Sequence, residues 1–422
     1  MNQPLFSHRV LVFGDDTRSF LSVVRSLGRR GIEIHAVPFK KYAPALSSRY
    51  ITKCHHLPAY DGSDRWITAL MQLISEFKFD VLMPCCDRSI RCLDAHRTEL
   101  AGIHMALPSR QVLECLFDKH ETRKQAKSAG VPVPRGRLLT DGDTVDSLVQ
   151  DYGLPLLIKA RRSYVLENLE HRGEVTIVRH SAQLGKVLAS LDDRDEFLVE
   201  EYFAGTGAGV SVLASEGRIL CVFQHGRLKE PRAGGGSSLR QSELIDPVLL
   251  SSCRKIARDT NLTGVAMFEF RIDRNSGQWV LLEVNARFWG SLPLPLALGV
   301  DFPYYQYQLL IYGREVSQPE YAAGIRARNF AINAYDVLLR DMRNGYFSLK
   351  MLAADLLDLA THPIAMLLGN EKSDTFQLDD LRPAFAELFF LPMKVIYHLI
   401  LLRLSAPRRS FGKNLIGQKH DA

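Results

Sequence analysis

Three polar side chains within residues 265–291 have the types and spacing to bind a divalent cation, and an arginine follows them. Glu269 and Glu283 lie in two alternating apolar segments that flank an Asn-Ser-Gly turn, a pattern typical of a β-hairpin. Asn285 and Arg287 follow Glu283 at alternate positions, so we expect these three to share one face of the sheet. Two carboxylates are costly to bury unless a cation offsets them, and Mg2+ prefers carboxylate oxygens together with substrate phosphates. The stretch therefore predicts a magnesium–nucleotide site, with surface ion pairs as the alternative.

Two lysines upstream of the hairpin could bind phosphates. Lys159 ends an apolar segment at residues 154–160 that is typical of a strand, and a lysine rarely stays in such a place without a partner. A phosphate would be that partner, although a lysine that extends its ammonium group into water is the alternative. Lys119 follows Asp118 in a predicted helix over residues 109–130, where a solvated helix face is the default interpretation.

A basic, glycine-rich segment at residues 225–240 could also approach an anion. Glycine N–H groups lie open to a ligand, and basic side chains neutralise its charge. A solvated loop is the alternative. Before this segment, a predicted strand at 197–203 ends in Glu200, Glu201 and Phe203, whose backbone could pair with the edge of a base while Phe203 packs near its face. An exposed acidic strand end is equally consistent with that pattern.

The elements that would position these residues form an α/β protein. Short apolar runs at 8–13, 32–37, 79–84 and 103–108 alternate with helical patterns, which predicts a doubly wound first domain over residues 1–108. Its first turn lacks G-x-G-x-x-G, so a redox role as a dinucleotide oxidoreductase is disfavoured. We expect a second α/β domain over residues 109–320 and a helical region over residues 321–422.

Composition narrows the class of protein. The chain has 422 residues, 46% hydrophobic and 24% charged, with a formal charge of +6 spread over 53 basic and 47 acidic residues. Such a balance argues against a dedicated nucleic-acid binder. Seven cysteines without a C-x-x-C pair indicate reduced thiols in a cytosolic protein, and the N-terminus shows no signal peptide. We therefore expect a cytoplasmic protein with small-molecule partners and no nucleic acid.

The segment 385–410 is strongly apolar, but prolines and basic residues interrupt it. Its longest uninterrupted run, VIYHLILL, is far shorter than the ~20 residues that a spanning helix needs. A helix docked on the protein is the first interpretation. Because Arg403, Arg408, Arg409 and Lys413 follow the apolar run, a helix lying in an anionic membrane interface at the inner face of the membrane is the second.

The order of these features resembles the ATP-grasp superfamily. LLEVNARFWGS looks like its E-x-N-x-R motif, FDKHETRKQAKSAGVPVP like the segment that opens the ATP-grasp domain, LPLLIKA like its phosphate-lysine strand and VEEYFAG like its adenine hinge. The first domain resembles the Rossmann-like preATP-grasp domain. The resemblance covers residues 8–315 and is closest to the carbamoyl-phosphate-synthase-like branch of ATP-dependent carboligases.

The resemblance implies a role for each matching residue. Phosphates would be bound by Lys119 and Lys159, and adenine by Glu200, Glu201 and Phe203. Mg2+, or Mn2+ in its place, would be held by Glu269, Glu283 and Asn285. Arg287 would be the catalytic residue, next to the transferred phosphate. The carboxylate substrate would be oriented, or the phosphates covered, by a further set: Arg227, Lys229, Glu230, Arg232, Ser237, Ser238 and Arg240.

Two features depart from the family pattern. The acidic residue that commonly binds ribose after the hinge has no counterpart in GTGAGVS, where Ala208 occupies its place, and the lid after Lys159 lacks a glycine-rich run. No glutaminase domain or biotin-carrying segment is evident either, which disfavours carbamoyl phosphate synthesis and biotin carboxylation.

The expected fold is thus a Rossmann-like preATP-grasp domain, then an ATP-grasp domain whose two α+β subdomains sandwich ATP, and a C-terminal helical extension. The expected function is an ATP-dependent ligase that activates a carboxylate as an acyl-phosphate and joins it to an amine, with a homodimer as one assembly. The alternative is a membrane-peripheral nucleotide-binding or regulatory protein without ligase turnover. The sequence does not name the acid or the amine.

Overall fold

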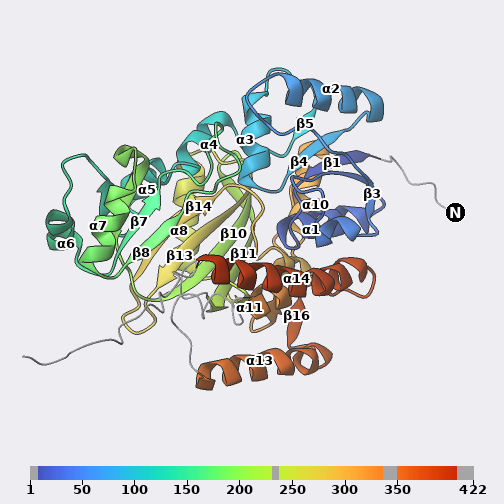
Figure 1. Cartoon of the computed structure of the whole chain (residues 1–422). Helices are drawn as coiled ribbons and strands as arrows, with labels where there is room; N and C mark the ends of the chain where they lie inside the picture. The colour runs from blue at the N-terminus through green and yellow to red at the C-terminus, as the bar shows by residue number, and fades with distance from the viewer. Residues whose placement is uncertain (1–7, 231–236, 336–348, 406–422) are drawn as a thin grey trace, which may run out of the picture.

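Figure 1 shows the computed structural model, which describes residues 8–230, 237–335 and 349–405. The N-terminal domain is built on a five-stranded parallel sheet of order β3-β2-β1-β4-β5. Its strands are β1 (Arg9–Phe13), β2 (Glu33–Val37), β3 (Ile51–Cys54), β4 (Val81–Pro84) and β5 (His104–Met105). Its helices are α1 (Ser19–Gly28), α2 (Arg65–Phe77) and α3 (Asp87–Ala95), with a 3-10 turn η1 (Pro44–Ser47). The predicted doubly wound sheet is confirmed, and β3 is the strand that the prediction lacked.

Two short helices lead into the second domain, α4 (Arg110–Leu116) and α5 (Lys119–Ser128). The expectation of one helix over residues 109–130 is therefore wrong. The chain is extended at Asp118, whose carboxylate accepts hydrogen bonds from the backbone N–H groups of His120 and Glu121 and so starts a new helix. This cap places Lys119 at the first position of α5.

A four-stranded antiparallel sheet follows, in the order β6-β9-β7-β8. Its strands are β6 (Gly136–Leu138), β7 (Leu156–Ala160), β8 (Val175–Val178) and β9 (Phe197–Glu201). Two helices and a 3-10 turn accompany it: α6 (Val145–Tyr152), α7 (Ser181–Ala189) and η2 (Arg194–Glu196). Apolar residues of β7, β8 and β9 pack against α6 and α7 as a separate small core. The other face of this sheet is free to carry polar side chains.

The largest sheet has seven strands in the order β14-β13-β10-β11-β12-β15-β16. They are β10 (Thr206–Ser215), β11 (Arg218–Lys229), β12 (Leu239–Glu243), β13 (Gly264–Ile272), β14 (Trp279–Asn285), β15 (Arg326–Arg328) and β16 (Glu371–Ser373). Helix α8 (Pro247–Asp259) packs on one face, and α9 (Pro293–Ala297) and α10 (Phe302–Tyr312) join the sheet to α1 through a shared core. The seven-stranded and four-stranded sheets together form the two subdomains that the sequence predicted.

The C-terminal region contains α11 (Phe330–Tyr335), α13 (Leu349–Leu367) and α14 (Arg382–Ser405). The sequence predicted a helical region over residues 321–422. The region is mostly helical, but it also supplies β15 and β16 to the large sheet. Arg25 of α1, almost fully buried, attaches this region to the N-terminal domain through Asp380 at 2.9 Å and through the carbonyls of Asp374, Thr375 and Asp380. Among the described residues, no helix is long and apolar enough to cross a membrane.

Candidate active site

The acidic residues of the hairpin lie together as predicted. Glu269 of β13 is directly opposite Glu283 of β14, and the strand register shifts by one residue immediately after this pair. The amide nitrogen Nδ2 of Asn285 lies between the two carboxylates, 3.1 Å from Oε1 of Glu269 and 3.0 Å from Oε1 of Glu283. Two carboxylate side chains and one amide side chain therefore converge on one point of the sheet.

The two acids differ in their electrostatic surroundings. Burial raises the pKa of Glu269, and the negative charge of Glu283 adds to this, although Arg227 donates a 2.5 Å hydrogen bond to Glu269. Burial would also raise the pKa of Glu283, but the positive charges of Lys119 and Lys159 and the bond from Asn285 outweigh it, so that pKa is lowered. A buried acid pair of this kind is stabilised by added positive charge.

The donor set fits a hard divalent cation, because it consists of two carboxylates and an amide at one place. The described part of the chain contains no group of three or more His, Cys, Asp and Glu side chains placed to hold a metal. Glu269, Glu283 and Asn285 would thus provide only part of a coordination shell. The remaining oxygen ligands would come from water and from the phosphates of a nucleotide, as is usual for Mg2+.

Arg287 connects this site to the N-terminal domain. Its Nε and Nη2 atoms donate to the carboxylate of Asp87 at 2.6 and 3.2 Å, and Nη2 also donates to Oδ1 of Asn285 at 2.8 Å. Asp87 opens α3 directly after β4, so it sits at the carboxyl edge of the parallel sheet. The sequence analysis missed Asp87, although ligand sites of open α/β sheets lie at that edge.

Lys119 and Lys159 are both buried on the side of the four-stranded sheet. The ammonium of Lys119 donates to the carbonyl of Ala160 at 3.0 Å and to Oγ of Ser163 at 3.3 Å. Burial lowers the pKa of Lys119, and the charge of Glu283 acts in the opposite direction. Since Lys119 and Glu283 influence each other's pKa, the two subdomains bring the predicted phosphate and metal residues into one electrostatic environment.

Glu200 and Glu201 have different environments although they are neighbours. Glu200 is completely buried, and its carboxylate pairs with Lys159 at 2.5 Å and with Arg123 at 2.6 Å. Glu201 lies nearer the surface, where its side chain pairs with Arg135 at 2.6 Å. Phe203 follows β9 and is half-buried. Glu200 therefore acts first as the counter-charge of Lys159, which the sequence pattern could not indicate.

Two glycines in β10 make room for polar side chains from β11. A Cβ atom at Gly209 would overlap the imidazole of His225, and one at Gly207 would lie 2.6 Å from both Cδ of Arg227 and Oε1 of Glu230. Ala208 points to the opposite face, into the core beneath α8. The GTGAG sequence therefore leaves space above the sheet that these neighbouring side chains fill.

Three of the seven residues predicted to orient the substrate or cover the phosphates are bound to the C-terminal region: Lys229, Ser238 and Arg240. Lys229 pairs with Asp355 and Asp358 of α13, and Arg240 pairs with Asp374. The hydroxyl of Ser238 donates to Asn333, and that of Ser237 donates to the carbonyls of Lys229 and Leu239. Arg232 lies outside the described residues. Arg227 and Glu230 are the members of this set that lie beside the acid pair, because Arg227 bonds to both Glu230 and Glu269.

Arg18 is a second residue that the sequence analysis missed. Its guanidinium lies against Gly290, three residues after Arg287, where glycine leaves space for it. Within the described ranges, this guanidinium has no hydrogen-bond or ion-pair partner. Burial lowers the pKa of Arg18, an effect that Asp16 opposes and that Arg240 strengthens. An arginine in this state is well suited to bind an anionic group.

Comparisons with known proteins agree with this architecture. Residues 193–331 match the family model described as "ATP-grasp in the biosynthetic pathway with Ter operon". Pyruvate carboxylase from Schizosaccharomyces pombe is 23% identical over 205 residues, which are 46% of this chain and 17% of that protein. The matched region thus spans less than a fifth of that relative.

Solved structures resemble a larger share of the chain. N5-carboxyaminoimidazole synthetase from Staphylococcus aureus, complexed with ADP, aligns with a TM-score of 0.60 and 15% identity over 81% of this chain and 87% of that one. L-amino acid ligase from Bacillus licheniformis aligns with a TM-score of 0.54 and 16% identity over 74% of this chain and 75% of that one. The chain has the ATP-grasp fold, preceded by a preATP-grasp domain, and this prediction is confirmed.

Proposed function

We propose that this chain, which has the ATP-grasp fold, is an ATP-dependent ligase that joins a substrate carboxylate to an amine and releases ADP and phosphate. The observation that carries the proposal is the pairing of Glu269 with Glu283, with Asn285 between them, close to the positive charges of Lys119 and of Lys159 on the four-stranded sheet. The arrangement provides acids for a divalent cation and bases for phosphates, and it includes no dedicated protein nucleophile among these residues.

Each of these residues has a task in the proposed reaction. Lys119 and Lys159 bind nucleotide phosphates. The ammonium group of Lys159 then interacts with both Glu200 and the triphosphate. Mg2+ held by Glu269, Glu283 and Asn285 would neutralise charge on the phosphates. The substrate carboxylate attacks the terminal phosphate to give an acyl-phosphate and ADP, and the amine then displaces phosphate. Positioning and charge stabilisation supply the rate enhancement in phosphoryl transfer.

Arg287 and Arg18 serve the acid substrate in this proposal. Arg287 stabilises negative charge at the transferred phosphate, and Asp87 and Asn285 hold its guanidinium in place. Arg18 lacks a partner in the described part of the protein, and its position near Gly290 suits the carboxylate of the incoming acid. The L-amino acid ligase and the N5-carboxyaminoimidazole synthetase named above share the fold, and neither identifies the acid or amine used by this chain.

The proposal is tested by ADP release over a matrix of carboxylic acids and amines, with product masses. We expect release that requires both partners and Mg2+ or Mn2+. Glu283→Gln should lower kcat about 100-fold or more, because it removes a carboxylate from the cation site. The control Glu320→Gln changes an exposed acid on the surface and should leave activity unchanged.

Two results would contradict this assignment. Full activity of Glu283→Gln would show that the acid pair does not hold the cation. Tight ATP binding without ADP release from any acid–amine pair would instead favour a nucleotide-binding or regulatory protein.

A further inference from the structure

Large apolar side chains are exposed mainly in the C-terminal region. Leu367 and Leu378 are exposed by 88% and 84%, and Phe389 by 70%. The exposed large apolar residues between positions 349 and 393 are Leu349, Leu356, Leu357, Ile364, Leu367, Leu368, Phe376, Leu378, Phe385, Leu388, Phe389, Phe390 and Met393. A contiguous stretch of chain with this many uncovered apolar side chains marks an interaction surface.

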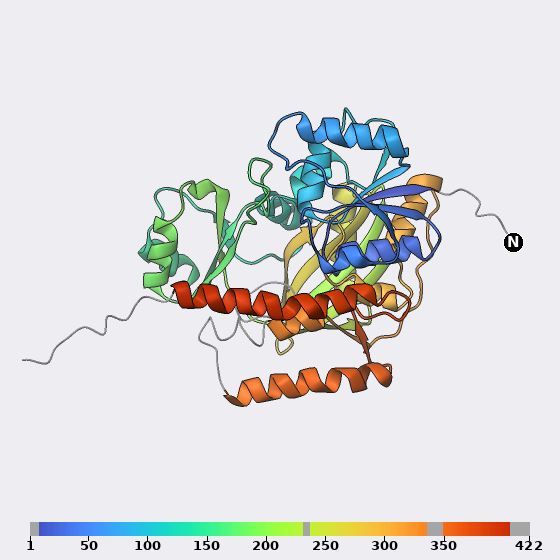
Figure 2. The same cartoon turned by 45° about the vertical axis from the view of Figure 1, so that its right-hand side comes forward.

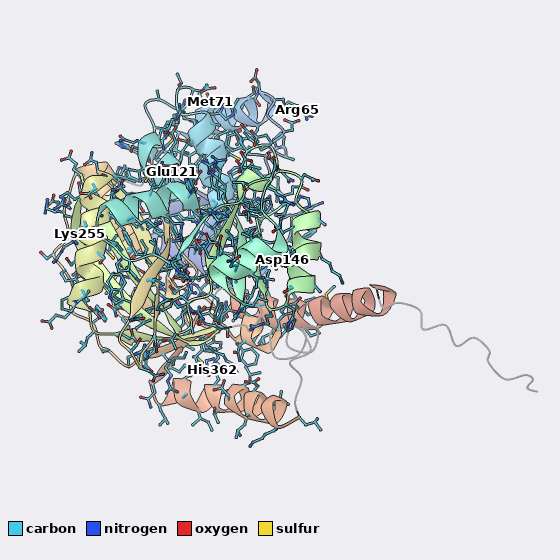
Figure 3. The ribbon with its side chains drawn as sticks, turned by 90° about the vertical axis from the view of Figure 1, so that its left-hand side faces the viewer. Arg65, Met71, Glu121, Asp146, Lys255 and His362 are labelled. Atoms are coloured by element: carbon cyan, nitrogen blue, oxygen red, sulfur yellow. The ribbon has the colours of Figure 1, made fainter. Side chains whose placement is uncertain are left out.

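Helix α13 is amphipathic. At 3.6 residues per turn, its exposed large apolar residues and Leu368 just beyond it fall within an arc of about 120°. The opposite side carries Asp355 and Asp358, which bond to Lys229 and Arg328, and His362, which bonds to Glu371. Figure 3 shows His362 on the side of α13 nearest the rest of the molecule. The apolar stripe of α13 therefore faces away from the protein.

Acidic side chains of the same region all have hydrogen-bond partners in the rest of the protein. Seven acids occur between residues 349 and 393, and each bonds to a group of the protein body: Asp355, Asp358, Glu371, Asp374, Asp379, Asp380 and Glu387. Lys350 and Arg382 are exposed and form no ion pair in the described structure. The outer surface of the region thus combines apolar and basic side chains, while each of its acids is paired or hydrogen-bonded, including Asp379, which is itself exposed.

Helix α14 continues this pattern along the chain. Figure 2 shows α13 at the lower edge of the molecule and α14 above it, across the front, and α11 contacts both helices. In the sequence, α14 contains the apolar run VIYHLILL near its end. Four basic residues follow this run: Arg403, Arg408, Arg409 and Lys413. A protein partner could cover the apolar side chains, but basic residues that border an apolar surface are complementary to anionic lipid headgroups.

We propose that residues 349–393 dock the protein on an anionic membrane surface. The apolar stripe of α13 and the exposed residues of α14 enter the interfacial layer, and Lys350 and Arg382 contact the headgroups. This inference uses no residue of the acid pair, so it stands or falls independently of the ligase reaction. It predicts binding that depends on both apolar insertion and lipid charge.

The test is co-sedimentation of the full chain with vesicles of phosphatidylglycerol and phosphatidylcholine, compared with vesicles of phosphatidylcholine alone. We expect binding to the anionic vesicles that weakens as salt is raised. The triple variant Leu357→Glu, Ile364→Glu, Phe389→Glu should lower the partition coefficient at least about 100-fold, because it places charge where apolar side chains insert. These three residues are exposed, so the variant should fold.

The matched control is Leu244→Glu with Val248→Glu, which adds charge at two exposed apolar residues near the start of α8. It should bind vesicles as the unaltered chain does. Failure of the unaltered chain to bind anionic vesicles, or equal binding by the triple variant, would overturn the proposal. A dimer in sedimentation velocity that the triple variant dissociates, without vesicle binding, would assign the surface to a second copy of the chain. Nucleotide binding measured on the same samples reports separately on the ATP site.

Discussion

The neighbouring acids Glu200 and Glu201 allow a sharp test of how the phosphate lysine is held. Glu200 is completely buried between Lys159 and Arg123, whose side chains are only 8% and 5% exposed. Glu200→Gln would leave two buried cations without their counter-charge. Removing one member of a buried charge group costs about 3–5 kcal/mol of unfolding free energy. We expect the β7–β9 sheet to be destabilised by an amount in that range.

The same substitution one residue later is the control. Glu201 pairs with Arg135, whose side chain is 68% exposed, so water screens the interaction. Glu201→Gln should therefore lower the unfolding free energy by much less than Glu200→Gln does. Hydrogen–deuterium exchange of β7 and β9 amides would measure the local opening free energy in each variant.

Nucleotide adds a second readout to this comparison. If Lys159 binds phosphate, the triphosphate supplies the negative charge that Glu200→Gln removes. Saturating ATP should then protect this variant from exchange more than it protects the unaltered protein. Equal destabilisation by the two substitutions would refute the assignment of Glu200 as the buried counter-charge. Absence of extra protection by ATP would refute the phosphate role of Lys159.

Three further predictions concern the framework around the site. Gly209→Ala should cost about 1–3 kcal/mol in urea unfolding because the new Cβ overlaps the ring of His225, and the added change His225→Ala should restore most of that loss. Burial would raise the pKa of Glu371, but its hydrogen bonds with His362 and Arg328 outweigh this and lower it. The stability that Glu371 provides is therefore complete above its unfolded pKa of about 4 and is lost as pH falls through the lower folded value, so proteolysis at α13 should increase only in acid. Arg25→Met should lower the unfolding free energy by about 3–5 kcal/mol and increase hydrogen exchange at residues 374–381. Unchanged exchange at these residues would contradict the role of Arg25 in attaching the C-terminal region.

The hairpin was predictable because local rules determine it. A turn sequence and alternation of apolar residues fix which side chains of two adjacent strands share a face, so Glu269, Glu283 and Asn285 could be grouped from the sequence. The carboxyl ends of β1, β2 and β4 were equally readable from apolar runs, whereas β3 was missed and β5 is shorter than its run. Asp118 was misjudged because an aspartate can either cap a new helix or lie within one, and no glycine or proline separates α4 from α5 in the sequence.

Contacts between distant segments could not be predicted in this way. The pairing of Lys159 with Glu200 depends on the register of β7 and β9, and that of Lys229 with Asp355 joins residues 126 positions apart. Strands β15 and β16 have three residues each, which is too short for alternation to appear. The sequence therefore predicted the groups that could do chemistry better than the ion pairs that hold them in place.

Strands β15 and β16 have a practical consequence for anyone who shortens this protein. A cut at residue 320 would expose the edge of β12, whose backbone groups now pair with β15, and such an open edge promotes aggregation. The same cut would also remove Asp380, the buried ion-pair partner of the Arg25 guanidinium. A truncation intended to remove only α14, part of the proposed membrane-docking surface, should begin beyond residue 381, so that the two strands and the Arg25 attachment are kept.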